Sequence, residues 1–210
     1  MDDQINDPPE RGGRARLSQE RSRARREQLI DAAATLFAEG GTKAITHRSV
    51  SEQAEMPLAT VSYYFDSIDV LVDELIARTL QSWTARLASL RPAEGERLSA
   101  SEAADRIGAI LHGVEPVGYA YELRTYLTAL RREHLLDEVH AMQGNAIEAV
   151  ADLGRAVGLE DPYWAAVRLT MMIGGSLVAI TDPETHSGNM AEILADMSRR
   201  VLEDAARLEG

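Results

Sequence analysis

The sequence predicts an all-α protein: an N-terminal domain of three helices containing a helix-turn-helix, followed by a larger C-terminal helical domain. Apolar residues recur at helical spacing in one stretch after another, and no stretch of note has a β-strand pattern. Residues 46–68, THRSVSEQAEMPLATVSYYFDSI, have the pattern of two short helices joined by a tight turn. Charge is also divided along the chain, with a basic segment near the N-terminus and an acidic remainder.

The first of the two short helices has a clear start. Thr46 is a good N-cap, and Val50 and Ala54 give this helix an apolar face at four-residue spacing. Pro57 cannot continue that helix but suits the first turn of the next one, which we expect over residues 58–65.

The second short helix divides into an inner and an outer side. Helical spacing places three apolar residues toward the core, namely Leu58, Val61 and Phe65. Hydroxyl-bearing residues are left to point elsewhere, namely Thr60, Ser62, Tyr63 and Tyr64. We therefore expect a helix whose outward surface consists mainly of hydroxyls and small groups.

Residues 1–17 are rich in proline, glycine and charge and lack apolar periodicity, so we expect a disordered tail. Seven arginines lie between Arg11 and Arg26. The tail is either a solubilising segment or an arm that follows a DNA backbone or enters the minor groove. The first helix is expected over about residues 22–39, ended by Gly40 and Gly41.

Composition limits the function classes. The 210 residues, 45% of them hydrophobic, suffice for one large or two small domains. The absence of cysteine excludes disulfides, thiol catalysis and cysteine metal sites. The chain has no long apolar run and a polar N-terminus, so we expect neither a membrane span nor a secretory signal, and a cytoplasmic protein.

The net charge of −12 argues at first against a nucleic-acid partner. However, residues 11–65 carry nine Lys and Arg against six Asp and Glu, whereas residues 66–210 carry thirteen against twenty-four. This division suits a protein that presents one surface to phosphates and keeps the other away from them.

Residues 26–76 resemble the DNA-binding region of the TetR (tetracycline repressor) family of bacterial transcription regulators. The resemblance lies in an amphipathic first helix ending in LFAEGG, the Thr46 start of the second helix, and TVSYYF followed by a helix capped by Ser67. Three positions depart from the family pattern. Glu55 replaces the usual turn glycine, Ile68 replaces a common lysine, and Pro57 stands where a Ser or Asp cap is common.

The resemblance implies a DNA-binding domain over residues 18–67 and a ligand-binding and dimerisation domain over residues 68–210. It implies a ligand-responsive repressor that binds a palindromic operator as a dimer, with recognition helices about 34 to 36 Å apart. The candidate DNA contacts are Thr46, His47, Arg48, Thr60, Ser62, Tyr63, Tyr64 and Ser67. Tyr64 has an alternative role, packing against the first helix.

The C-terminal part is predicted to contain a helix over about residues 68–90, a loop over 91–98, and five further helices. Ser99 and Glu102 have capping-box spacing for the first of these five, and Asn189 and Glu192 are expected to open the last. The helix beginning at Pro162 is apolar nearly all round, so one amphipathic neighbour cannot cover it in a monomer. In the family the last two helices pair with their copies, which implies a homodimer formed by residues 162–181 and 189–208. Gly174 and Gly175 are explained either by close helix approach or by room for a ligand.

A small-molecule effector site is also implied within the C-terminal helices. Aromatic, methionine and glutamate side chains are the candidates for an apolar cavity that meets a cationic group, although each is also explained as a core or solvated residue. The candidates are Trp83, Glu115, Tyr119, Tyr121, Glu122, Tyr126, Met171 and Met172.

Catalysis has little support in the sequence. Beyond His134 and His140, which at six residues apart do not share a helix face well, the five histidines have no metal-ligand spacing. No phosphate-binding loop or nucleophile elbow is present, so we expect no enzyme, metal or cofactor. Two alternatives remain: a helical enzyme or small-molecule carrier, and a nucleoid-type DNA binder indifferent to sequence. The operator, the effector, the regulated genes and the choice between repression and activation are not encoded in any recognisable pattern.

Overall fold

The computed structural model describes residues 10–110, 116–179 and 190–209, and in these residues the chain is helical with no β-strand. Contacts within the chain divide it into two compact units, Met1–Leu75 and Ile76–Gly210. The division falls inside one continuous helix, α4 (Ile68–Ala88). The expected all-α class is confirmed, while the expected domain boundary at residue 67 stays a prediction. No helix in the described ranges is long and apolar enough to cross a membrane.

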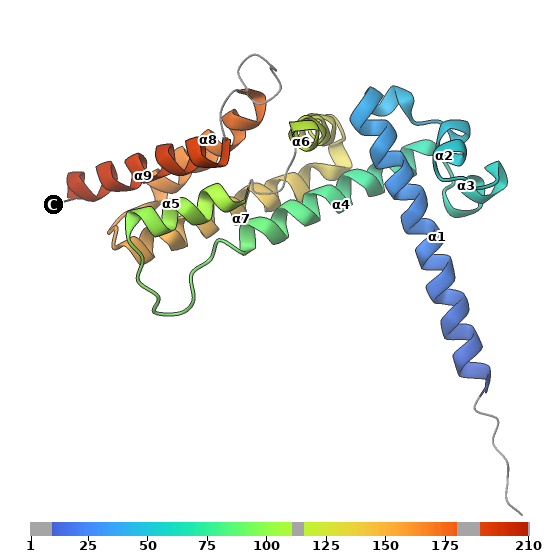
Figure 1. Cartoon of the computed structure of the whole chain (residues 1–210), viewed down its shortest axis with the longest axis horizontal. Coiled ribbons are helices and arrows are strands. Elements are labelled where there is room, and N and C mark those ends of the chain that lie inside the picture. Colours follow the sequence, from blue (N-terminus) through green and yellow to red (C-terminus); the bar gives the residue numbers. More distant parts are fainter. Residues whose placement is uncertain (1–9, 111–115, 180–189, 210) are drawn as a thin grey trace, which may run out of the picture. The chain divides into compact units, whose positions relative to one another are not determined.

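The N-terminal unit contains α1 (Glu10–Gly40), the 3-10 helix η1 (Gly41–Ala44), α2 (His47–Gln53), α3 (Leu58–Tyr64) and the first turns of α4. Figure 1 shows α1 reaching well past α2 and α3. The expectation that α1 starts at about residue 22 is wrong, because residues 10–21 are helical as well.

The extra turns of α1 include Gly12 and Gly13, but most of their residues are arginine, glutamate, glutamine, alanine or leucine, which are good helix formers. Once the packed half of a helix is nucleated, each added residue costs little, so such a sequence continues the helix without apolar contacts. Arg16 and Glu20 add an ion pair one turn apart, 3.0 Å between Nε and Oε1. Residues 10–17 therefore do not form the disordered tail expected from composition, and residues 1–9 lie outside the described part of the chain.

Buried aromatic and aliphatic side chains form the core of the N-terminal unit. Phe37 of α1, Val50 of α2 and Val61 of α3 are fully buried, as is Phe65, which follows α3. Arg26 of α1 lies over the Phe65 ring, 4.9 Å from its centroid, and forms an ion pair with Glu74 of α4. A single arginine therefore joins α1, the end of α3 and the start of α4.

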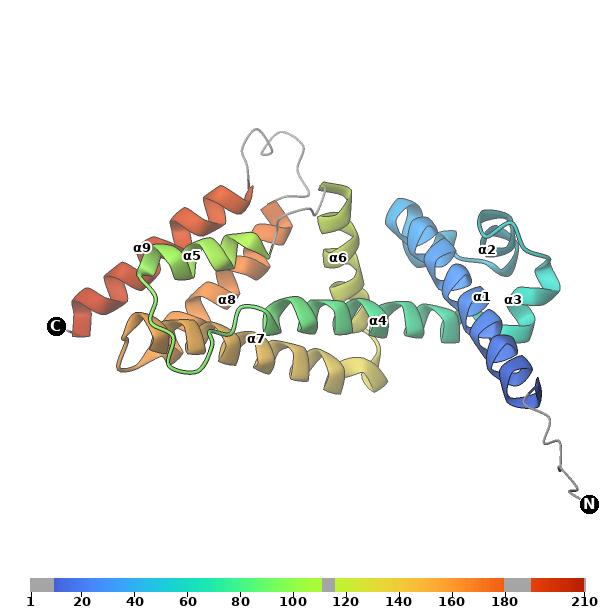
Figure 2. The same ribbon diagram turned by 60° about the horizontal axis from the view of Figure 1, so that its bottom comes forward.

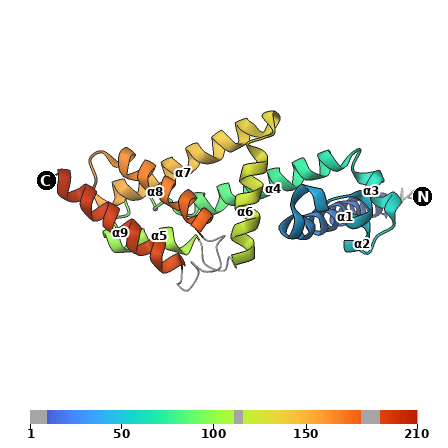
Figure 3. The ribbon, with the colours of Figure 1, turned by 90° about the horizontal axis from the view of Figure 1, so that it is seen from above.

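The C-terminal unit contains the rest of α4, then α5 (Ala100–Ala109), α6 (Pro116–Ala129), the 3-10 helix η2 (Glu133–Leu135), α7 (Leu136–Val157), α8 (Pro162–Ala179) and α9 (Met190–Glu209). Figure 2 shows α5 and α9 side by side, and these two helices share the most extensive contact among the described helices. The second large contact joins α7 to α8, which also lie together in Figure 3.

Local signals set the ends of several helices in this unit. Ser99 and Glu102 form the expected capping box at the start of α5. Gly158 ends α7 in the left-handed conformation with φ of 102°, where glycine has no steric cost. Asn189, expected to open the last helix, lies outside the described residues.

Part of the last two helices is exposed apolar surface. Large hydrophobic side chains remain open to solvent on both, namely Tyr163, Trp164 and Met171 on α8 and Ile193, Met197 and Leu208 on α9. A Cβ added to Gly174 or Gly175 would meet nothing within 4 Å, so contacts inside the described chain do not explain these glycines. The expected partner surface on these helices stays a prediction.

Candidate nucleic-acid interface

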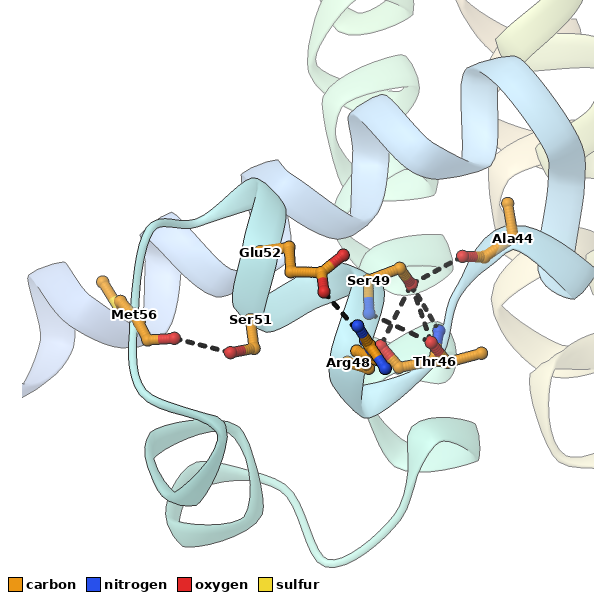
Figure 4. Close-up of polar contacts among 7 residues, drawn as sticks. All are labelled: Ala44, Thr46, Arg48, Ser49, Ser51, Glu52 and Met56. Atoms are coloured by element: carbon orange, nitrogen blue, oxygen red, sulfur yellow. Dashed lines mark hydrogen bonds and ion pairs between the residues drawn. The ribbon is translucent and has the colours of Figure 1, made fainter.

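A network of hydroxyl groups fixes the start of α2 (Figure 4). The Thr46 hydroxyl accepts a hydrogen bond from the Ser49 backbone N–H at 3.0 Å, and the Ser49 hydroxyl accepts one from the Thr46 N–H at 2.9 Å. The Ser49 hydroxyl also donates to the Ala44 carbonyl at 2.7 Å. Thr46 is the N-cap that the sequence predicts, and this network fixes the orientation of the first turn of α2.

Arg48 extends from this first turn into solvent. Its side chain is 85% exposed, and its Nε lies 2.8 Å from Oε1 of Glu52 on the next turn. The hydrogen bond and the charge of Glu52 raise the pKa of Arg48 further above its ordinary value, so the guanidinium stays charged. Arg48 is thus a cation at the surface whose present partner is itself exposed.

The turn between α2 and α3 contains the strained residue that the sequence indicates. Glu55 has φ of 53°, the left-handed conformation that usually favours glycine. The Ser51 hydroxyl donates to the Met56 carbonyl at 2.6 Å and closes this turn (Figure 4). Pro57 precedes α3 without a side-chain cap, as the sequence indicates.

The inner side of α3 differs from the sequence-based expectation at one position. Val61 and Phe65 are buried as expected, but Leu58 is 52% exposed and its assignment to the core is wrong. Its place in the first turn of a seven-residue helix explains the difference, because the core beneath α3 is filled from Val61 onward. The outward surface of α3 therefore includes an apolar side chain that helical spacing alone assigned inward.

The hydroxyl-bearing residues of α3 lie in different surroundings. Ser62 is exposed, Thr60 is half-buried, and Tyr63 is 79% exposed. The Tyr64 hydroxyl lies 3.2 Å from the hydroxyl of Ser22 on α1, and its ring meets that of Tyr63 edge to face. Tyr64 thus packs against the first helix, the alternative that the sequence left open for it.

A groove of about 840 Å3 runs between α1 and α3. Its α1 wall includes the exposed side chains of Arg21 and Arg25, and its α3 wall includes Thr60 and Tyr63. Guanidinium groups on one wall and hydroxyls on the other are the groups that bind phosphate oxygens in DNA complexes. The groove therefore matches a sugar-phosphate backbone in its chemistry.

The remaining predicted DNA contacts lie at helix starts. His47 is half-buried in the first turn of α2. The Ser67 hydroxyl accepts a hydrogen bond from the Val70 N–H at 3.2 Å and so caps α4, as the sequence predicts. All eight predicted residues lie within the N-terminal unit, but their contact with DNA stays a prediction.

Arg21, Arg25 and Leu58 were not singled out as site residues from sequence. The four-residue spacing of Arg21 and Arg25, shared by Ser18 and Ser22, places them on one face of a helix and is the signal that identifies them. Ser18 and Arg21 lie before residue 22, where the apolar periodicity of the first helix begins, so periodicity alone does not extend the helix to them.

The predicted effector residues are partly brought together in the C-terminal unit. Trp83 and Arg86 of α4 lie with their ring and guanidinium 4.4 Å apart, and Arg86 forms an ion pair with Glu122 of α6. The Thr79 and Tyr121 hydroxyls, 2.8 Å apart, join the same two helices. These contacts place Trp83 and Glu122 beside one guanidinium.

The Arg86–Glu122 pair is buried and incompletely satisfied. Glu122 is only 8% exposed, and burial raises the pKa of its carboxyl, an effect that the Arg86 guanidinium opposes but does not cancel. Within the described residues, Nε of Arg86 and Oε2 of Glu122 are buried with no hydrogen-bond partner. Buried polar atoms without partners are rare, and a ligand or water is a common explanation.

The other predicted effector residues are more dispersed. Tyr126 accepts a hydrogen bond from Nε2 of Gln143 at 2.5 Å, and Met172 packs against the core. Met171 is 73% exposed, so it lines no enclosed cavity of the described chain. Glu115 lies outside the described residues, as does the side chain of Tyr119.

The fold and this surface define a helix-turn-helix DNA-binding protein. Residues 29–75 match the model of the family described as bacterial regulatory proteins, tetR family. The chain is 28% identical over 167 residues to an uncharacterized HTH-type transcriptional regulator in the dhlA 5′ region of Xanthobacter autotrophicus, covering 77% of this chain and 83% of that protein. It is 42% identical over 52 residues to the HTH-type transcriptional repressor KstR2 of Rhodococcus jostii, covering 25% and 26%.

Solved structures share the fold. The multidrug binding protein EbrR, in complex with imidazole, matches 84% of this chain and 94% of its own with a TM-score of 0.61 at 23% identity. A second EbrR structure contains malachite green. Residues 29–75 thus form a DNA-binding region of the tetR type, and the chain is a DNA-binding transcriptional regulator.

Proposed function

We propose that the chain is a repressor that binds a palindromic operator as a homodimer and releases it when a small molecule binds the C-terminal unit. The observation that carries the DNA-binding part is α3, exposed along Leu58, Ser62 and Tyr63, beside a groove lined by two arginines. Recognition helices of this kind enter the major groove while neighbouring groups hold the backbone.

The proposed DNA contacts follow from the chemistry of the side chains. Thr60 and Ser62 suit base edges, while Arg48 suits a guanine edge or a phosphate. Backbone phosphates suit the groups around them: Thr46, His47, Tyr63, Ser67, Arg21 and Arg25. Tyr64 has a structural role in this proposal, holding α3 to α1 through Ser22.

The dimer is supported by the exposed apolar side chains of α8 and α9. Tyr163, Trp164 and Met171 are large, and leaving such a surface in water is unusual for a monomer. Two copies joined through these helices would present two recognition helices related by a two-fold axis. Sedimentation at micromolar concentration tests this, and a monomer would refute the dimer.

The effector site is supported by the two unsatisfied atoms of the Arg86–Glu122 pair beside Trp83. A ligand that hydrogen-bonds to either atom binds more tightly to the conformation in which that atom is accessible. A difference in ligand affinity between the DNA-binding and the released conformation is sufficient for a switch. EbrR suggests malachite green as a probe of an aromatic, cationic ligand. A Trp164→Phe variant leaves Trp83 as the only tryptophan, so quenching on titration would report binding near Arg86.

The function as a whole is tested by DNA binding of the purified chain. A preferred duplex is first selected from a random DNA library with the purified chain. The affinity of the chain for the selected duplex and for random duplex, measured at two salt concentrations, then distinguishes three classes of protein. A specific regulator prefers the selected sequence, a nucleoid-type binder binds both alike, and an enzyme or carrier binds neither. A regulator of transcription acts on DNA, so we also propose a cytoplasmic protein that is not an enzyme.

A further inference from the structure

The proposed recognition helix α3 lacks the side chains that distinguish bases by paired hydrogen bonds. Its sequence, LATVSYY, contains no arginine, lysine, asparagine or glutamine. These four side chains make the paired hydrogen bonds that distinguish guanine or adenine in the major groove. Serine and threonine hydroxyls bond to either kind of edge, so they discriminate less. Besides these hydroxyl groups, α3 presents apolar side chains on its surface.

That apolar surface lies at the end of α3 that reads bases. Leu58 and Ala59 are the first two residues of the helix, and both are exposed. In a helix-turn-helix the N-terminal residues of the recognition helix contact base edges. The one apolar feature that a base presents in the major groove is the 5-methyl group of thymine.

The charges around α3 indicate which partner covers this surface. Arg21 and Arg25 line the groove on one side, and Arg48 is exposed in the first turn of α2. An apolar surface on a unit that also presents exposed cationic side chains matches a polyanion that carries methyl groups between its phosphate strands. Duplex DNA has both features in its major groove.

We propose that Leu58 contacts the 5-methyl group of a thymine in each half-site and is a determinant of operator specificity. The inference rests on the proposed function, since it requires a preferred DNA sequence. Burying one methyl group strengthens binding by about fourfold. A two-fold symmetric operator contains the contact twice, which gives about fifteenfold for the pair.

The experiment replaces single thymines of the selected operator by uracil, which removes the methyl group and leaves the hydrogen-bonding edges unchanged. Affinity is measured by fluorescence anisotropy for the wild type and for Leu58→Ala. The control variant is Leu127→Ala, the same change at a leucine of α6 that is 50% exposed. Thermal unfolding checks that both variants are folded.

The expected result has two parts. Wild type and Leu127→Ala lose about fourfold for uracil at one thymine of a half-site and about fifteenfold when both half-sites are changed. Leu58→Ala binds the thymine and uracil operators alike. Restoring a methyl group on a different base, as 5-methylcytosine paired with guanine at this position, should recover part of the loss only when Leu58 is present.

Two results would overturn the inference while the proposed function stands. One is an operator in which no thymine is sensitive to uracil. The other is a Leu58→Ala variant that keeps the wild-type ratio between thymine and uracil. A chain that selects no sequence at all would overturn the proposed function itself, and this inference with it.

Discussion

Replacing both Arg21 and Arg25 by alanine should reduce the salt dependence of operator binding. Both side chains line the groove between α1 and α3 and both are exposed, so the fold should be unaffected. If each arginine neutralises one phosphate, a dimer loses four contacts. Each contact contributes about 0.9 to the slope of log K against log salt, so the slope should become less steep by about 3.6.

This difference is large enough to measure directly. Between 50 and 200 mM salt, a slope difference of about 3.6 amounts to about 150-fold in relative affinity. Anisotropy titrations of a labelled operator at four or five salt concentrations give the slope for each variant. Thermal unfolding without DNA verifies that the variant is folded.

A matched control lies on the same helix. Arg16 and Arg23 are exposed, neither lines the groove, and their double replacement changes the charge by the same amount. Because exposed charges are screened over about 10 Å at 0.1 M salt, this control should change the slope by less than about 1. An equal change in both double variants, or no change in the groove variant, would refute the groove as a phosphate site.

Three further predictions concern single residues. Glu52→Gln should raise DNA affinity about threefold in an anisotropy titration, because Arg48 loses its exposed partner and the surface loses a negative charge. An unchanged affinity would place Arg48 away from the DNA. Glu55→Gly should raise the free energy of unfolding by about 0.5 kcal/mol in urea denaturation, since relief of about 1 kcal/mol of left-handed strain exceeds the entropy cost of glycine, and a destabilised variant would contradict this. Because burial raises the pKa of Glu122, the folded state holds that proton more tightly than the unfolded state, so unfolding free energy should fall as pH rises from about 4.5 through the raised pKa. Glu122→Gln should remove this component, and a wild-type-to-variant difference that is constant with pH would exclude it.

Local sequence signals predicted the helix starts that depend on neighbouring residues. The Thr46 cap, the Ser99 and Glu102 capping box and the Ser67 cap are all confirmed, because each is formed within three or four residues of chain. The left-handed turn at Glu55 was also indicated by position.

Features that depend on packing or on helix propagation were harder to predict. Helical spacing assigned Leu58 to the core, but Leu58 is exposed. Burial of this side chain depends on which residues of other helices pack beneath the first turn of α3, and the spacing within α3 contains no information about them. The α1 turns before Ser22 have no apolar face, so periodicity gave no signal for them although charged helix formers extend the helix. Arg86 was missed because its partners come from α4 and from a helix 36 residues further along the chain.

Arg26 has a mechanical consequence for the N-terminal unit. Its guanidinium lies against Phe65, the residue that ends α3, and pairs with Glu74 two turns into α4. The short link between α3 and α4 is therefore braced from the side and does not act as a free hinge. A rotation of the first turns of α4 should therefore move α3 with it. The chain connects these two helices only through Phe65, Asp66 and Ser67, and Arg26 adds a side-chain connection between them.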